Sequence, residues 1–332
     1  MRGTTSIRNE RGLRGGRDAG AGDPSVPPER ACLARSNPRR APSAALGTAR
    51  LRRFITLNLT VTVTALALAA AFARANAKAT TVSVVFSGTA ATLSYQHDPA
   101  SAGAPYSKLH LSISSEGRRT YAHPVYAVLC GSNCWPASGI AGSPVLRVAD
   151  IERDGSPDVI LDLYSGGAHC CFITQVYRYD AAVGTYAVSQ RDFADAGASL
   201  LTLGGAPVFV SADDRFAYAF APFAFSGLPL QIWSFARGRF GDVTRRYPAQ
   251  IAADAARQYR GFVNDRQQRL GLGFLAAWAA DEDLLGRTAR VARTLAAQNR
   301  AGELRSADGL SKSGGAFIAQ LQRFLARTGY RR

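Results

Sequence analysis

The chain has 332 residues, which is enough for two ordinary domains or for one large domain with extensions. Hydrophobic residues make up 47% of it and charged residues 19%, so most of the chain can bury a core and a wholly disordered protein is excluded. Four histidines and one methionine argue against a histidine-rich metal carrier.

The first fifty residues have the composition of a disordered segment. Residues 1–50 hold ten arginines against four acidic residues, with many glycines and prolines and almost no large apolar side chains. Such a segment cannot bury enough surface to offset the entropy that it would lose on ordering. We therefore predict a disordered basic extension over residues 1–50.

Residues 51–77 have the three-part pattern of a secretory signal peptide. Arg52 and Arg53 precede an apolar run over 54–72, and the run is followed by the small residues Ala75 and Ala77. A transmembrane anchor is the alternative, but the run contains an asparagine and four threonines, and small residues follow it rather than a stop-transfer cluster. The pattern predicts a bacterial exported protein in the periplasm, the cell envelope or the medium, and one that is not an integral membrane protein after cleavage.

The positive charge is unevenly distributed. The formal net charge is +16, but residues 1–77 carry 13 basic and 4 acidic residues, and residues 78–248 carry 13 of each. Residues 249–332 hold 14 basic residues against 7 acidic ones, which would attract an anionic cell-envelope polymer or another protein. No RNA-binding signature with interleaved aromatic residues is present, so specific nucleic-acid recognition is not expected.

Residues 78–248 alternate short apolar runs with turns and predict a β domain. The runs are rich in valine, isoleucine, tyrosine and phenylalanine, as strands prefer. The predicted strands are 81–86, 91–95, 109–114, 120–126, 144–149, 159–164, 174–179, 208–211, 217–220 and 230–235. A weak internal repeat relates residues 145–179 to residues 200–235, and this period is compatible with propeller blades. A sandwich or a barrel remains an alternative.

Residues 249–332 change to helical periodicity and predict a small basic helical domain. Three apolar stripes have the spacing of a helix face. They are Ile251, Ala255, Tyr259 and Phe262; then Leu284, Thr288, Val291 and Leu295; and finally Phe317, Leu321, Phe324 and Leu325, with Gly329 ending the last helix. The predicted fold class is α+β: a mainly antiparallel β domain, propeller-blade-like or a sandwich, followed by a small C-terminal helical domain.

An acidic turn between two predicted strands has the spacing of a calcium loop. Its oxygen-bearing residues stand at alternate positions: Asp150, Glu152, Asp154, Ser156 through its carbonyl, and Asp158. Gly155 permits the sharp turn, and calcium takes six to eight hard oxygen ligands. We predict a structural calcium ion here; the alternative is an ordinary solvated Asp-Gly turn.

The same block resembles the FG-GAP repeat of integrin-type β-propellers and of bacterial secreted repeat proteins of the VCBS kind. The likeness is carried by the strand–DxExDGxxD–strand pattern over about 146–163, and it is faint over 200–235. It implies that the loop holds calcium between two strands of a blade. Glu152 replaces the usual Asp or Asn, and Leu161 stands where an EF-hand has its bidentate glutamate. The stretch 162–171 is similar to uncharacterised bacterial exported proteins with such repeats, which implies no activity.

Four cysteines remain after the signal peptide: Cys130, Cys134, Cys170 and Cys171. An even number in an oxidising compartment predicts two structural disulfides, for which three pairings exist. The bonds would link the two segments, or Cys170 would bond its neighbour. The alternatives are a zinc or copper site that includes His169, or a redox-active pair of cysteines.

A secreted hydrolase with a site around Asp162–Cys171 is the enzymatic alternative. Asp162, Ser165 and His169 have the residue types of a triad, but no Gly-x-Ser-x-Gly elbow occurs, and closeness in sequence does not make three side chains converge. We therefore lean against an enzyme.

Three further features are expected to be structural. Residues 281–283, Asp-Glu-Asp, predict a solvated helix turn, and the arginines 287, 290 and 293 predict a solvated helix face. The aromatic run 216–225 predicts core packing of a strand against a second sheet, with an exposed carbohydrate or peptide platform as the alternative.

The sequence thus predicts an exported, calcium-binding, non-enzymatic binding or envelope-associated module, and it does not identify a ligand.

Overall fold

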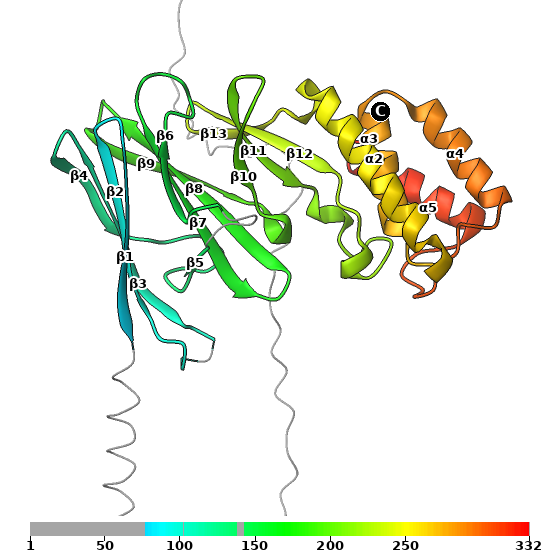
Figure 1. Ribbon diagram of the computed structural model, residues 1–332, viewed down its shortest axis with the longest axis horizontal. Helices are drawn as coiled ribbons and strands as arrows, with labels where there is room; N and C mark the ends of the chain where they lie inside the picture. The colour runs from blue at the N-terminus through cyan, green and yellow to red at the C-terminus, as the bar shows by residue number, and fades with distance from the viewer. Residues whose placement is uncertain (1–76, 102, 138–142, 332) are drawn as a thin grey trace, which may run out of the picture. The chain divides into compact units, whose positions relative to one another are not determined.

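The computed structural model describes residues 77–101, 103–137 and 143–331, so the extension predicted over 1–50 and nearly all of the predicted signal peptide lie outside the described residues. Its strands lie between Lys78 and Asp242, and its α-helices lie between Pro248 and Arg327 (Figure 1). The predicted α+β class is confirmed, because antiparallel sheets are followed by helices.

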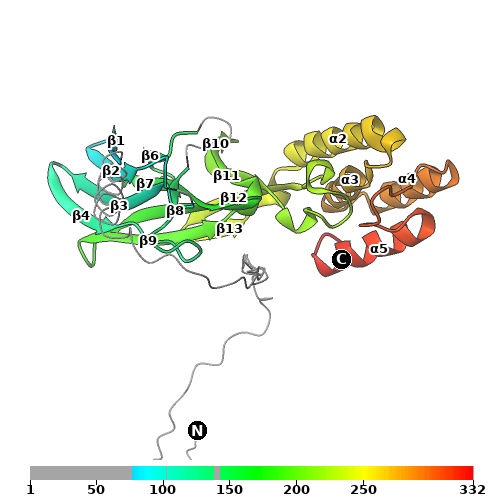
Figure 2. The ribbon, with the colours of Figure 1, turned by 90° about the horizontal axis from the view of Figure 1, so that it is seen from below.

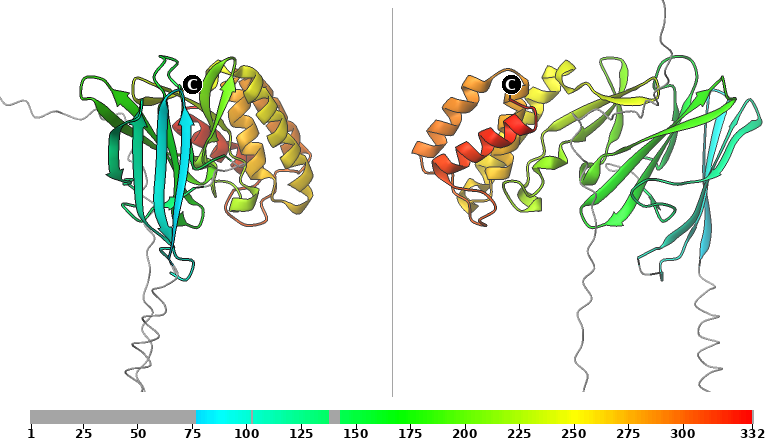
Figure 3. Two further views of the ribbon diagram at one scale, coloured as in Figure 1. Left: turned by 60° about the vertical axis from the view of Figure 1, so that its left-hand side comes forward. Right: turned by 180° about the vertical axis from the view of Figure 1, so that it is seen from behind.

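The first sheet is a four-stranded antiparallel meander (Figure 3, left). Its strands are β1 (Lys78–Phe86), β2 (Thr89–His97), β3 (Tyr106–Ser115) and β4 (Arg118–Pro124). The strands predicted over 81–86 and 91–95 pair as one hairpin, and those predicted over 109–114 and 120–126 pair as another. Each turn has two residues with positive φ, Ser87-Gly88 and Glu116-Gly117, which is the backbone that matches the twist of paired strands.

The second sheet is buried on both faces. Its strands are β5 (Trp135–Pro136), β6 (Leu146–Ala149), β7 (Asp158–Gly167), β8 (Cys170–Asp180) and β9 (Thr185–Asp192). Leu161 and Leu163 of β7 share a core with Leu93 of the first sheet, whereas Ile160 shares another core with Phe209 of the third sheet. Since successive side chains point to opposite faces, burial of both faces explains an apolar run without alternation.

The third sheet repeats the meander of the second. Its strands are β10 (Ser199–Leu203), β11 (Ala206–Ala212), β12 (Leu230–Ala236) and β13 (Arg239–Asp242). Both copies of the weak internal repeat therefore lie in antiparallel sheets, and none of the three sheets of the described residues closes on itself. The strand predicted over 217–220 is wrong, because this part of the β11–β12 connection consists of short 3-10 turns and bends, including η3 (Asp214–Phe216) and η4 (Phe223–Phe225).

Four helices follow and pack on one another (Figure 2). They are α2 (Pro248–Asp265), α3 (Leu272–Leu284), α4 (Thr288–Arg300) and α5 (Gly314–Arg327). The stripes predicted for the first and last of these are confirmed, with Ile251, Phe262, Phe317 and Leu321 buried. The middle stripe is divided between two helices, because the chain breaks at Gly286, which has φ +73°.

The aromatic connection joins the third sheet to the helices. Phe216 and Phe220 lie in the helical core, with ring centroids 4.8 and 5.1 Å from the ring of Phe324. Core packing is thus the correct interpretation of these rings, but they pack against helices rather than against a second sheet. This contact holds the β11–β12 connection beside the C-terminal segment of the chain.

Candidate functional site

The acidic turn is held by its own side chains. Asp150 accepts hydrogen bonds from the backbone N–H groups of Asp154 at 3.0 Å and Gly155 at 2.9 Å, and Asp154 accepts from the N–H of Ser156 at 2.9 Å. Gly155 has φ +85°, a conformation that favours glycine. The sharp turn predicted from the sequence is therefore present.

The carboxylates of this turn repel one another. Asp158 is only 2% exposed and accepts one hydrogen bond from the backbone of Ile151 at 3.3 Å. Burial raises the pKa of Asp158 to about 7, and the charges of Glu152, Asp154 and Asp150 add to the rise. A cation at the turn would relieve this repulsion.

Glu152 has partners outside the acidic turn. Its carboxylate lies 2.6 Å from the Arg178 guanidinium on β8, and it also accepts a hydrogen bond from the backbone N–H of Arg237 in the β12–β13 turn. Glu152 therefore ties the second sheet to the third. Within the described ranges, no group of three or more histidine, cysteine or acidic side chains is arranged to hold a metal ion.

The four cysteines pair within their own segments. Cys130 and Cys134 form a disulfide with a Cα–Cα distance of 5.1 Å, and Cys170 is paired with the adjacent Cys171. The pairing that links the two segments is therefore wrong. All four sulfurs therefore lie in bonds between cysteines that are close in sequence.

The three residues of the hydrolase alternative do not form a triad. Asp162 accepts from Arg147 at 2.5 Å and from Thr174 at 2.7 Å, and burial raises its pKa. Ser165 accepts from the backbone N–H of Cys171 at 2.7 Å.

His169 is directed elsewhere. Its Nδ1 lies 3.8 Å from the Asp195 carboxylate, and its ring centroid is 3.9 Å from that of Phe223. The three residues thus have different partners, and the geometry gives the serine no general base.

The Asp-Glu-Asp segment of α3 is buried, so the predicted solvated turn is wrong. Asp281 is 0% exposed, and Glu282 and Asp283 are 3% and 5% exposed. Helix α3 is surrounded by the rest of the helical core, so charged residues near its end face the interior as well. Burial first, and then the neighbouring carboxylate of Asp254, raise the pKa of Asp281 to about 10.

Two of the three arginines expected on a solvated face neutralise this buried segment. Glu282 lies 3.1 Å from Arg290 and 3.7 Å from Arg287, whereas Asp283 lies 3.1 Å from Arg331 near the C-terminus. Arg293 is exposed, as predicted. Arg287 and Arg290 are exposed as well, so the predicted solvated face is present, and part of its positive charge neutralises a buried carboxylate.

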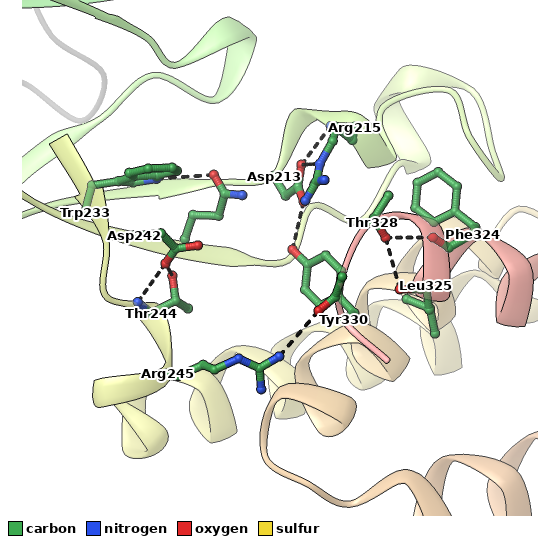
Figure 4. Close-up of polar contacts among 12 residues, drawn as sticks. Asp213, Arg215, Trp233, Asp242, Thr244, Arg245, Phe324, Leu325, Thr328 and Tyr330 are labelled. Atoms are coloured by element: carbon green, nitrogen blue, oxygen red, sulfur yellow. Dashed lines mark hydrogen bonds and ion pairs between the residues drawn. The ribbon is translucent and has the colours of Figure 1, made fainter. Parts of the chain in front are cut away.

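A pocket of about 300 Å³ lies where the third sheet, the end of α3 and the residues after α5 meet (Figure 4). We call it the Tyr330 pocket. Its lining is Arg215, Leu230, Gln231, Asp242, Val243, Thr244, Arg245, Arg246, Leu284, Thr328, Gly329 and Tyr330. This volume is at the lower end of the range for small-molecule sites.

One wall of the pocket is a buried polar cluster (Figure 4). Tyr330 is 6% exposed and donates its hydroxyl hydrogen bond to Asp213 at 2.9 Å. Arg215 contacts the same carboxylate through two nitrogens, at 2.8 and 2.5 Å. Burial, the charge of Asp213 and their hydrogen bond raise the pKa of Tyr330 well above its usual value, so this hydroxyl keeps its proton.

The opposite wall comes from the segment after β13. Asp242 accepts from the backbone N–H of Thr244 at 2.9 Å and from its hydroxyl at 2.6 Å, which orders the short turn η5 (Thr244–Arg246). That turn carries Arg245 and Arg246 into the lining. Arg245 donates to the backbone carbonyls of Leu284 at 3.2 Å and Gly329 at 3.5 Å, and so bridges the helices.

The sequence did not reveal this pocket because its lining comes from segments more than a hundred residues apart. The β11–β12 connection, the start of β12, the end of β13 with the turn after it, the end of α3 and the C-terminal residues each supply a part. The paired basic residues Arg245 and Arg246 just before a helix were the only local signal. Nothing in their spacing shows that Tyr330 lies opposite.

Comparisons with known proteins found a relative from an exported compartment. A probable thylakoid lumen protein of Synechocystis is 32% identical over 149 residues, which are 43% of this chain and 44% of that protein, so the chain spans less than half of the relative's length. No family model matches the chain. No solved structure matches it. Among the described residues, no helix is both long and apolar enough to span a membrane.

Proposed function

We propose that this chain is a non-enzymatic binding protein of an exported compartment, and that it takes a small ligand in the Tyr330 pocket. The pocket is the observation that carries the proposal, since five separate parts of the chain line it and several of its polar groups are ordered by hydrogen bonds. The lumenal name of the relative and the two disulfides support an exported location.

Filling the pocket should abolish ligand binding. We expect some members of a small-fragment library to give saturation-transfer NMR signals with the wild-type chain and to lose them with Thr328→Trp, because the indole would occupy the space beside Tyr330. Thr288→Trp is the matched control, since Thr288 is exposed at the start of α4 and outside the lining. Leu284→Phe provides a second occlusion from the other wall. If no fragment distinguishes the two tryptophan variants, the pocket is not a binding site.

We also propose that calcium braces the turn between β6 and β7. Asp150, Asp154 and Asp158 would supply carboxylate oxygens, with the carbonyl of Ser156, and the sequence resemblance to FG-GAP repeats supports this proposal. The ion would offset the repulsion that burial of Asp158 makes costly. Its role is structural, since it would fix two strands of the second sheet.

Removing calcium should lower the melting temperature. Free calcium at a hundred times its dissociation constant would stabilise the folded chain by about 2.7 kcal/mol, which is several degrees for a protein of this size. Asp154→Asn should remove most of this dependence, whereas Asp308→Asn, in an exposed turn elsewhere, should leave it intact. A melting curve that stays unchanged by a chelator and by any level of free calcium would exclude the ion.

A further inference from the structure

We infer that the Tyr330 pocket takes a small oxyanion, a carboxylate or phosphate group, through Arg245 and Arg246. This inference rests on the proposed function and names the chemical class of its ligand. The argument starts from the charges of the lining, which contains three arginines and one aspartate.

Only one of the three arginines is neutralised by a carboxylate. Arg215 forms an ion pair with Asp213, which also accepts a hydrogen bond from Tyr330. The positive charge of Arg215 is therefore balanced by the negative charge of Asp213. Arg245 donates only to two backbone carbonyls, which carry no formal charge. For Arg246, no side-chain hydrogen bond or ion pair occurs with any residue that the structure describes.

The remaining polar groups of the lining favour a ligand that accepts hydrogen bonds. Gln231 uses its carbonyl oxygen to accept from the Trp233 indole at 3.3 Å, so its NH₂ group is the part left to donate. Thr328 already donates its hydroxyl hydrogen to the carbonyl of Phe324 at 2.7 Å, so it adds no donor, and the donors left for a ligand are the Gln231 amide and the arginines. Guanidinium groups bind carboxylates and phosphates through paired, charge-assisted hydrogen bonds.

Asp242 is the opposing charge in the lining. One of its carboxylate oxygens accepts hydrogen bonds from the backbone N–H and the hydroxyl of Thr244. Asp242 is exposed to solvent. Its charge weakens the field of Arg245 and Arg246 without cancelling it. Removing that charge while keeping the shape should therefore strengthen anion binding.

The test compares three probes of similar length and different charge on the nitrogen-15-labelled full chain at constant ionic strength. They are succinate, the neutral succinamide and the dication putrescine, with inorganic phosphate as a second anion. The reporter is the indole N–H signal of Trp233, which bonds to the pocket residue Gln231 and is assigned with Trp233→Phe. We expect saturable shifts with succinate or phosphate, and none with succinamide or putrescine.

Matched variants separate the pocket from general surface charge. Arg246→Gln should weaken the anion about tenfold, which corresponds to one charge-assisted hydrogen bond, and Asp242→Asn should strengthen it. Arg293→Gln, an exposed arginine of α4 outside the lining, should change nothing. Equal weakening by Arg246→Gln and Arg293→Gln would overturn the inference as charge screening.

The outcomes also separate this inference from the proposed function. Shifts with succinamide or putrescine alone would overturn the anion assignment and leave the pocket as a ligand site. If no probe shifts the Trp233 signal, the anion inference is wrong, and the fragment comparison between Thr328→Trp and Thr288→Trp still decides whether the pocket binds anything.

Discussion

Replacing Asp281 with asparagine is expected to stabilise the protein at neutral pH. Asp281 is fully buried in α3, and the carboxylate of Asp254 lies close enough to share a hydrogen bond with it. Its pKa in the folded chain is about 10, so folding at neutral pH requires that this carboxyl takes up a proton. Asparagine has nearly the same shape and needs no proton.

The pKa values of Asp281 in the unfolded and folded chain determine how the stability changes with pH, and over which pH range. The pKa of an unfolded aspartate is near its usual value of 3.8, so the folded chain binds the extra proton between about pH 4 and pH 10. The wild-type protein therefore loses stability as the pH rises through this window. Each unit between the unfolded pKa and the working pH costs about 1.4 kcal/mol, for a total of up to about 4 kcal/mol at pH 7.

Chemical denaturation at pH 4 and pH 8 checks this prediction. We expect Asp281→Asn to gain roughly 1–3 kcal/mol at pH 8, because the amide needs no proton but its polar group stays buried, and to gain little at pH 4. Glu116→Gln, an exposed carboxyl in the β3–β4 turn, is the control that should show no such difference. A gain that is the same at both pH values would mean that Asp281 is not held protonated.

Gly273→Ala is expected to destabilise the protein strongly. Gly273 lies in the first turn of α3, where a Cβ atom would be 2.3 Å from the carbonyl oxygen of Phe225 and 3.1 Å from the side chain of Ala221. Because the nearest obstacle is backbone, it cannot rotate away. The β11–β12 connection would have to separate from α3, at a cost of about 2–3 kcal/mol or more.

Gly315→Ala provides the matched control for that substitution. Gly315 is an exposed residue in the first turn of α5, and no other atom lies within 4 Å of the position of its Cβ. Alanine there should stabilise the chain by up to about 1 kcal/mol, because it lowers the entropy of the unfolded state and favours the helix. Opposite changes in the unfolding midpoint are therefore expected from the same Gly→Ala replacement. If both variants unfold alike, the close approach of α3 to Phe225 does not contribute.

The sequence by itself determined the features that depend on neighbours along the chain. The two hairpins follow from two-residue turns at Ser87-Gly88 and Glu116-Gly117, and the outer helices follow from apolar residues at helical spacing. The sharp acidic turn follows from Gly155 and the side chain of Asp150. Each of these depends on backbone conformation and on contacts within a few residues.

Only the tertiary structure decided the features that depend on residues far apart. The alternation of Phe216 and Phe220 fits a strand, but packing against Phe324 draws this segment into turns beside the helices. Asp281 lies in a polar triplet that suggests solvent, and its burial is imposed by the elements that surround α3. The Tyr330 pocket exists because five separate segments meet there. The free energy that brings them together comes from long-range packing, which local sequence patterns do not encode.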